Sequence, residues 1–246
     1  MRSSSGPNLI VIGAMKCGTS ALHRLLDRHP QVAMSRPKEL NFFFGPARGP
    51  ADGDWTPQGN WHRGEDWYAR HFPADVPVRG ESSPGYTSPD HPESAGRIAM
   101  LLPDARLVYL VRDPIVRAVS QYRHHRREGG EPRPLEEALL DPASQYLARS
   151  RYAERLDPFL TRFPREQIAV VATEDLRRAP GRTLARLFAF AGVDPGFGAH
   201  AVAEPAGAPD PLDVDPRLRA RLAAELRDDV ARLRALVDAP FADWSL

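Results

Sequence analysis

The sequence predicts a three-layer α/β protein whose central, mainly parallel sheet is flanked by helices. Two observations lead to this fold class. Short apolar runs rich in Val, Ile and Leu recur along the chain, which is typical of strands buried on both faces of a parallel sheet. Stretches with helical spacing separate these runs, so strands and helices alternate. The chain has 246 residues, and we expect a single domain over residues 1–246.

Five segments are expected to form the strands: residues 8–14, 31–34, 76–81, 106–112 and 167–172. The clearest are NLIVIGA, RLVYLVR and QIAVVA, because each is a continuous apolar run that contains β-branched residues. Seven segments are expected to form helices: residues 18–27, 65–72, 92–102, 113–128, 144–162, 181–191 and 216–237. In the fourth helix Asp113 is the expected N-cap and Pro114 the first helical residue.

The last expected helix carries one apolar stripe, made of Leu218, Leu222, Leu226, Val230 and Leu233. A different pattern occupies residues 45–64, which are rich in Gly, Pro and Asp and predict a long loop that faces the substrate.

The composition excludes several classes of protein. Lys and Arg number 33 against 32 Asp and Glu, and this near-zero balance argues against a nucleic-acid partner. The single cysteine, Cys17, allows no intramolecular disulfide, and the eight histidines lack metal-binding spacing, so we expect no metal. No apolar run approaches the ~20 residues of a membrane span, and the N-terminus lacks a signal-peptide core. The expected location is the cytoplasm.

Residues 13–20 (GAMKCGTS) follow the first strand and predict an anion-binding loop. A glycine turn at the start of a helix presents backbone N–H groups to an anion. Lys16 adds a positive charge, and only it and Lys38 are lysines among the 33 basic residues, which suggests sites that need a compact ammonium. The lysine precedes the second glycine by two residues, so the loop is not the Walker A motif of nucleoside-triphosphate hydrolases. The alternative is a simple strand–helix turn.

Residues 16–22 (KCGTSAL) resemble the KxGTTxL phosphosulfate loop of sulfotransferases that use 3′-phosphoadenosine 5′-phosphosulfate (PAPS). The resemblance implies a P-loop-like sulfotransferase fold. It also implies that the 5′-phosphosulfate end of the donor is held by Lys16, the backbone of Cys17, Gly18, Thr19 and Ser20.

Residues 107–122 (LVYLVRDPIVRAVSQY) resemble the segment of the same family that binds the 3′-phosphate. The resemblance implies that Arg112 and Ser120 contact this phosphate. An arginine at a strand end suits the role, because its planar fork can donate two hydrogen bonds to a phosphate. Tyr152 matches a family position near the donor. The alternative for Arg112 is a capping salt bridge with Asp113.

One family feature is absent from the sequence. Many carbohydrate sulfotransferases carry a Lys-Gly-Arg segment near the C-terminus that reaches the 3′-phosphate. Residues 192–216 of this chain contain neither Lys nor Arg. What replaces this basic segment is left open.

Residues 36–43 (RPKELNFF) resemble the Lys-Glu-x-His-Phe-Phe segment of carbohydrate-type sulfotransferases, whose glutamate is the proposed general base. The resemblance implies that Glu39 accepts the acceptor proton and that Lys38 neutralises charge on the transferring group. Asn41 stands where the family often has histidine. The alternative is an exposed Lys38–Glu39 ion pair.

Residues 80–86 (GESSPGY) resemble the family turn Glu-Lys-[ST]-Pro-x-Tyr, with Ser82 where lysine is usual. Glu81 is therefore a second candidate for the base, or a carboxylate that orients the substrate, or a residue that only fixes the turn.

The expected function is transfer of the sulfuryl group of PAPS to a hydroxyl or amine of a sugar, lipid or other small-molecule acceptor. Lys16, Lys38, Glu39 and Glu81 are the candidate catalytic residues, and 3′,5′-adenosine bisphosphate (PAP) is the expected product. Two alternatives are a nucleotide-dependent phosphotransferase (kinase) on the same fold and a non-catalytic nucleotide-binding module. The acceptor and the oligomeric state are left open.

Overall fold

The computed structural model describes residues 6–46, 58–72, 75–199, 214–237, 239 and 241–246. At its centre is a five-stranded sheet with the strand order β2-β3-β1-β4-β5, in which every neighbouring pair is parallel. The strands are β1 (Leu9–Gly13), β2 (Val32–Met34), β3 (Val78–Ser82), β4 (Arg106–Val111) and β5 (Ile168–Ala172). All five expected strands are present, which confirms the predicted fold class.

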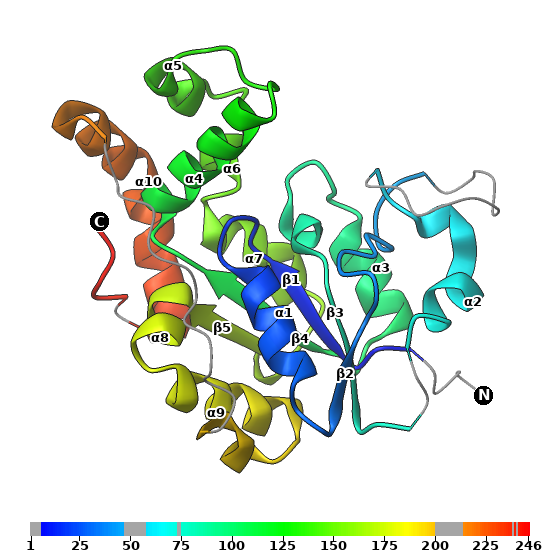
Figure 1. Ribbon diagram of the computed structural model, residues 1–246. Coiled ribbons are helices and arrows are strands. Elements are labelled where there is room, and N and C mark those ends of the chain that lie inside the picture. Colours follow the sequence, from blue (N-terminus) through cyan, green and yellow to red (C-terminus); the bar gives the residue numbers. More distant parts are fainter. Residues whose placement is uncertain (1–5, 47–57, 73–74, 200–213, 238, 240) are drawn as a thin grey trace.

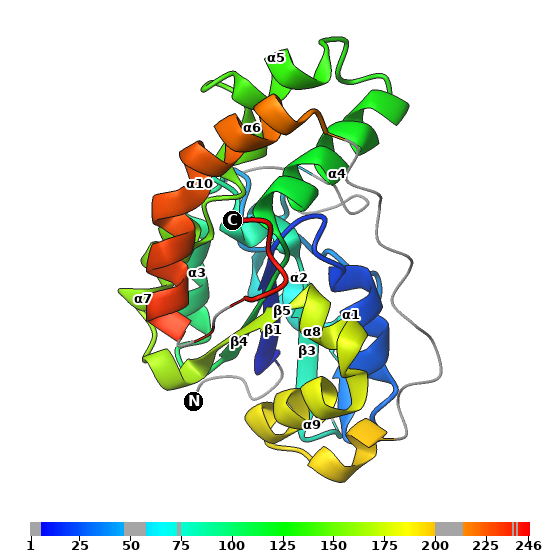
Figure 2. The same ribbon diagram turned by 90° about the vertical axis from the view of Figure 1, so that its left-hand side faces the viewer.

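Helices cover both faces of the sheet (Figures 1 and 2). One face carries α1 (Thr19–Asp27), α8 (Thr173–Arg178) and α9 (Pro180–Ala191), and the other carries α3 (Ser94–Leu101), α7 (Tyr152–Leu160) and α10 (Pro216–Val237). Because both faces are covered, β1 is buried along its whole length, and so is β4 beyond its first residue. The five stripe residues of α10 are all buried, as predicted.

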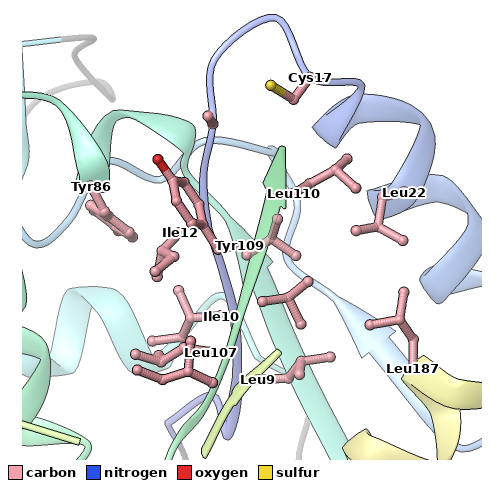
Figure 3. Close-up of a cluster of buried hydrophobic side chains, with 14 of the residues drawn as sticks. Leu9, Ile10, Ile12, Cys17, Leu22, Tyr86, Leu107, Tyr109, Leu110 and Leu187 are labelled. Atoms are coloured by element: carbon pink, nitrogen blue, oxygen red, sulfur yellow. The ribbon is translucent and has the colours of Figure 1, made fainter. Parts of the chain in front are cut away.

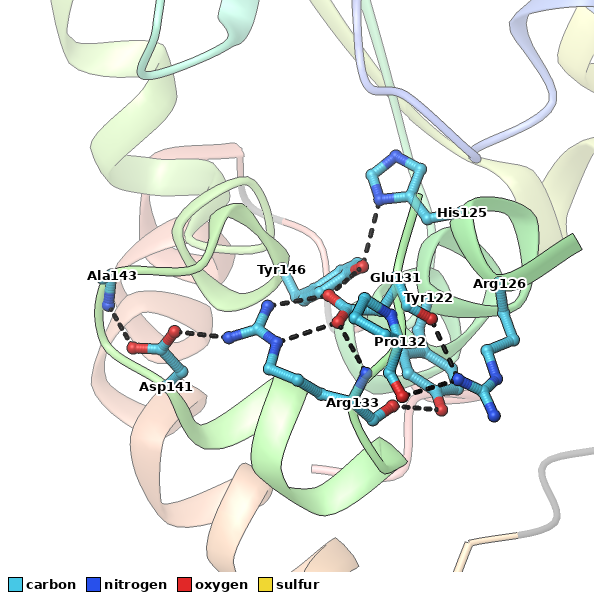
Figure 4. A network of polar contacts seen from close by, with 9 residues as sticks. All are labelled: Tyr122, His125, Arg126, Glu131, Pro132, Arg133, Asp141, Ala143 and Tyr146. Carbon is cyan, nitrogen blue, oxygen red and sulfur yellow. Dashed lines mark hydrogen bonds and ion pairs between the residues drawn. The ribbon is translucent and has the colours of Figure 1, made fainter. Parts of the chain in front are cut away.

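A second group of helices extends beyond the carboxyl ends of the strands (Figure 1). It consists of α4 (Pro114–Arg127), α5 (Leu135–Leu140) and α6 (Gln145–Ala148), and it forms its own apolar cluster with the first half of α10. Figure 4 shows the polar network that joins these helices. Arg133 donates to Glu131 (2.7 Å) and to Asp141 (2.6 Å), and Tyr146 donates to Glu131 (3.0 Å). Hydrogen bonds from Arg133 lower the pKa of Glu131 to about 2, so this carboxylate is ionised at neutral pH.

The prediction of one helix over residues 144–162 is wrong, because the chain bends between α6 and α7. The cause is a fully buried arginine of α4. The Nε of Arg117 donates to the Oγ of Ser150 (2.6 Å), and its guanidinium also donates to the carbonyl of Tyr146. These long-range bonds fix residues 149–151 as a turn. The short helices α5 and α8 were not predicted.

The expected loop at residues 45–64 is described only in part, since residues 47–57 lie outside the described residues. Its last part is a short helical turn, Trp61–Arg63, which leads into α2 (Gly64–Ala69). Trp61 packs against Phe42, with ring centroids 5.2 Å apart, and the guanidinium of Arg97 lies 4.7 Å from its ring. The described part of this segment therefore packs on the body of the protein. Across the described ranges no helix is long and apolar enough to cross a membrane.

The N-terminus of α4 is capped as the sequence predicts. One carboxylate oxygen of Asp113 accepts from the N–H of Ile115 (2.9 Å) and of Val116 (3.0 Å), and the other accepts from the N–H of Ser245 (2.7 Å). We expect Asp113→Ala to lower the free energy of unfolding by about 1–2 kcal/mol, because two capped N–H groups lose their acceptor.

Urea denaturation measures this loss. The matched control is Asp104→Ala, which removes an exposed carboxylate with no cap, and its free energy of unfolding should stay near that of the wild type. Equal losses in the two variants would contradict the capping role.

Candidate active site

A cavity of about 640 Å³ opens at the carboxyl ends of the strands. Such an edge is where open α/β sheets bind their ligands. Three separate sequence motifs meet on its wall. Residues 16–20 come from the loop after β1, Glu39 from the segment after β2, and Arg112 from the end of β4.

The loop after β1 has a shape that only certain residues permit. Gly13 lies so close to the ring of Tyr109 that a Cβ on it would be 2.8 Å away. Gly18 has a φ of +87° at the N-cap of α1, a conformation that favours glycine. Figure 3 shows this loop above the apolar core, with Cys17 near its top. The N-terminus of the nine-residue helix α1 therefore faces the cavity beside Lys16, an arrangement that suits an anion.

Two side chains, those of Tyr152 and Thr173, hold the loop against the end of β4. The hydroxyl of Tyr152 donates to the carbonyl of Arg112 (2.8 Å) and lies 3.5 Å from the Sγ of Cys17. The Oγ1 of Thr173 lies 2.5 Å from the carbonyl of Cys17. Tyr152 is fully buried and is not on the cavity wall, so it lies beneath the loop after β1 and the end of β4. Burial raises the pKa of the Cys17 thiol to about 11, which makes it a poor nucleophile at neutral pH.

The predicted residues after β2 differ in their exposure to the cavity. Glu39 lines it, and its carboxylate forms an ion pair with the ammonium of Lys38. Lys38 itself is not on the wall. Asn41, two residues further along, does line the cavity. The ion pair that the sequence offered as the alternative is therefore present, and Glu39 also lies on the cavity wall.

Strained backbone is concentrated at this site. Among the described residues other than glycine, four have a φ in the left-handed region: Lys16 (68°), Glu39 (64°), Asn41 (50°) and Phe241 (44°). The first three line the cavity. Such conformations are costly for side chains with a Cβ and persist where the surroundings enforce them, which is typical of functional sites.

Two predicted residues lie away from the wall. Ser120 is buried within α4 and does not line the cavity. Glu81 is completely buried at the end of β3, where its carboxylate accepts hydrogen bonds from Tyr68, Tyr86 and Ser83. Burial raises the pKa of Glu81 to about 7, although the three hydroxyls act in the opposite direction.

The sequence reasoning missed several residues of the wall, namely His91, Arg149, Thr173 and Arg177. Thr173 and Arg177 follow β5, so the rule that ligands bind at carboxyl ends of strands could have indicated them. Arg149 lies in the turn that the sequence did not reveal, and it donates to Asp90 (2.8 Å). Within the described ranges, no three His, Cys, Asp or Glu side chains are placed to hold a metal ion.

The loop with Lys16, the arginines and the carboxylate of Glu39 on one wall of an α/β fold are an arrangement that suits group transfer from an anionic donor. The chain belongs to the sulfotransferase family, whose sequence pattern matches residues 7–196. This match favours sulfuryl transfer over the kinase alternative.

Three similar proteins show the range of the family. The solved structure of a sulfotransferase from Alicyclobacillus acidocaldarius is 31% identical, with a TM-score of 0.77, and the match covers 98% of this chain and 99% of that one. The bifunctional heparan sulfate N-deacetylase/N-sulfotransferase 2 of Bos taurus is 29% identical over 212 residues, 77% of this chain but only 22% of that protein. The membrane-associated sulfotransferase kil1 of Dictyostelium discoideum is 36% identical over 121 residues, 47% of this chain and 22% of that protein.

Proposed function

We propose that this protein transfers the sulfuryl group of PAPS to a hydroxyl or amine of a sugar, lipid or other small-molecule acceptor. The observation that carries the proposal is the meeting of the loop at residues 16–20, Arg112 and Glu39 on one cavity wall. The heparan sulfate enzyme named above acts on a carbohydrate, which favours a sugar acceptor here. Three expectations from the sequence stay predictions. They are that the whole chain forms one domain, that the loop at residues 45–64 faces the acceptor, and that the protein is located in the cytoplasm.

The cationic wall fits such a donor. PAPS supplies an already activated sulfuryl group when it is bound, so no metal is needed for activation. Lys16 and the N–H groups at the start of α1 hold the 5′-phosphosulfate, and Arg112 holds the 3′-phosphate through its planar fork. Arg177, also on the wall, adds positive charge on the side of β5. Tyr152 acts from below by fixing Arg112 and the loop.

Glu39 takes the proton from the acceptor as the acceptor oxygen or nitrogen bonds to sulfur. The bond between sulfur and the bridging phosphate oxygen breaks, and Lys16 stabilises the negative charge that develops on that oxygen. Lys38 forms an ion pair with the carboxylate of Glu39 and so holds this side chain in place. PAP and the sulfated acceptor are the products.

One face of the cavity wall is aromatic. The rings of Phe44 and His91 are stacked, with centroids 3.8 Å apart and planes within 3°, and both residues line the cavity. Such a face suits the apolar face of a sugar ring or an aromatic metabolite.

Binding of PAP compared with Mg²⁺-ATP, measured by thermal shift, tests the choice of donor. We expect PAP to raise the melting temperature at concentrations where Mg²⁺-ATP does not. Transfer from labelled PAPS in an acceptor screen then tests catalysis. Stabilisation by Mg²⁺-ATP alone would favour the kinase, and PAP binding without transfer to any acceptor would favour the non-catalytic module.

A further inference from the structure

The backbone around Glu39 is held by three hydrogen bonds to the end of β3 and the turn after it. The N–H of Glu39 donates to the carbonyl of Ser82 (3.0 Å). The N–H of Asn41 donates to the Oγ of Ser83 (3.0 Å), and the N–H of Phe42 donates to the hydroxyl of Tyr86 (3.0 Å). Residues 39–42, here called the base segment, include two of the strained left-handed residues on the cavity wall.

Two of these three bonds continue to a single carboxylate. Ser83 donates its proton to one oxygen of Glu81 (3.0 Å), and Tyr86 donates to the other (2.6 Å). A hydroxyl that donates to the carboxylate turns its lone pairs outward, so it is oriented to accept the N–H of the base segment. Glu81 therefore sets the direction of both hydroxyls, although it is fully buried and does not line the cavity.

We propose that ionised Glu81 is a positioning residue, which acts through Ser83 and Tyr86 to hold the base segment in the strained conformation that aims Glu39 into the cavity. This inference rests on the proposed function. The hydrogen bonds of the base segment to Ser83 and Tyr86 compensate the energetic cost of its left-handed backbone. These two hydroxyls donate to different oxygens of Glu81, so both oxygens of this side chain must be acceptors.

Protonation of Glu81 removes its ability to accept hydrogen bonds on both oxygens. A neutral carboxyl carries one O–H, so it must itself donate, and one of the hydroxyls that face it must rotate away. The titratable groups that face Glu81 are Tyr68 of α2 and Tyr86, and burial holds the pKa of each well above its ordinary value of 10. Neither tyrosine therefore ionises near neutral pH, and the change of charge falls on Glu81, whose pKa is about 7.

Activity and stability should respond to this titration in opposite directions. The pKa of Glu81 is higher in the folded protein than the ordinary 4.5, so the folded state binds this proton more tightly than the unfolded chain. Its contribution to stability is fully present below about pH 4.5 and is lost as the pH rises through about 7. The kcat should instead rise as the pH increases through about 7, because the ionised form of Glu81 holds the base segment.

The test compares Glu81→Gln, Ser83→Ala and Tyr86→Phe with the wild type in sulfate transfer from labelled PAPS. We expect Glu81→Gln to lower kcat by about tenfold or more, because an amide cannot accept on both sides, while PAP binding stays unchanged. Each relay variant should lower kcat by several-fold, and the Glu81→Gln/Ser83→Ala double variant should lose little beyond Glu81→Gln alone. The matched control is Tyr122→Phe, which loses a tyrosine hydrogen bond to Arg133 far from the base segment and should retain the wild-type kcat.

Two further readouts do not depend on a general loss of structure. At pH 8 Glu81→Gln should melt at a higher temperature than the wild type, since it removes a buried charge. Amide hydrogen exchange over the base segment should be faster in Glu81→Gln than in the wild type, and faster in the wild type at pH 6 than at pH 8 after correction for intrinsic rates.

The outcomes separate the two proposals. If Glu81→Gln leaves both kcat and exchange of the base segment unchanged, Glu81 does not position this segment. If Glu81→Gln abolishes the chemical step while Ser83→Ala and Tyr86→Phe retain the wild-type rate, Glu81 acts as the base instead. If the wild type transfers no sulfate but the exchange result holds, the proposed function fails and the positioning role stands.

Discussion

Replacing Glu39 with glutamine is expected to lower the rate of the sulfuryl-transfer step by about 10²–10⁴-fold, the usual contribution of a general base. Glutamine keeps the shape of the side chain but cannot take a proton. PAP binding should stay near the wild-type value, because Glu39 belongs to the segment after β2 and not to the two segments proposed to hold the donor. Single-turnover transfer at saturating PAPS measures the chemical step directly.

Asn41→Ala is the matched comparison for this variant. Asn41 lines the same cavity and shares the left-handed backbone, but its amide cannot act as a base. We expect its loss to change acceptor affinity more than the chemical step, and Glu81→Gln to cost less than Glu39→Gln. An intact chemical step in Glu39→Gln would overturn the assignment of the base and leave the reaction class untouched.

The second large effect concerns the donor. Lys16→Ala and Arg112→Ala should each weaken PAP binding by about 2 kcal/mol or more, the scale for a charged hydrogen bond that loses its partner. By calorimetry this corresponds to a rise in Kd of about 30-fold. Lys16→Arg should also bind weakly, because a planar fork cannot replace a compact ammonium in a tight loop.

Two controls separate charge from backbone in these variants. Lys16 has a φ of 68°, so Lys16→Gly removes the ammonium and also relieves the strain, whereas Lys16→Ala removes only the ammonium. Equal losses in both show that the charge matters and not the strain. Arg219→Ala removes an exposed arginine of α10 and should bind PAP as the wild type does. Wild-type affinity in both Lys16→Ala and Arg112→Ala would falsify the donor assignment.

Most of the fold could be predicted because its signals are local. β1, β4 and β5 each form a continuous apolar run, and α4 begins at an aspartate followed by proline. The turn between α6 and α7 could not be predicted, since it depends on Arg117, which lies some thirty residues earlier in the sequence and is buried against that turn. A pattern of neighbouring residues does not reveal a contact with a residue so far away in the sequence.

The candidate site, too, could be predicted only in part. Motifs placed Lys16, Glu39 and Arg112 at carboxyl ends of strands, and the structure brings them to one wall. Burial was not visible in the sequence. Glu81 lies near the end of β3 and Tyr152 begins α7, yet both side chains are buried beneath the wall, because tertiary packing decides which way a side chain turns.

The hydroxyl of Tyr152 between Arg112 and Cys17 joins the two segments proposed to hold opposite ends of the donor. Neither segment can shift without breaking a buried contact to the other, so the spacing between the two anion sites is set before any ligand arrives. A preset spacing reduces the ordering cost of binding and selects by length. We therefore expect the site to favour a nucleotide whose two anionic groups match this distance over a nucleotide that carries only one anionic group.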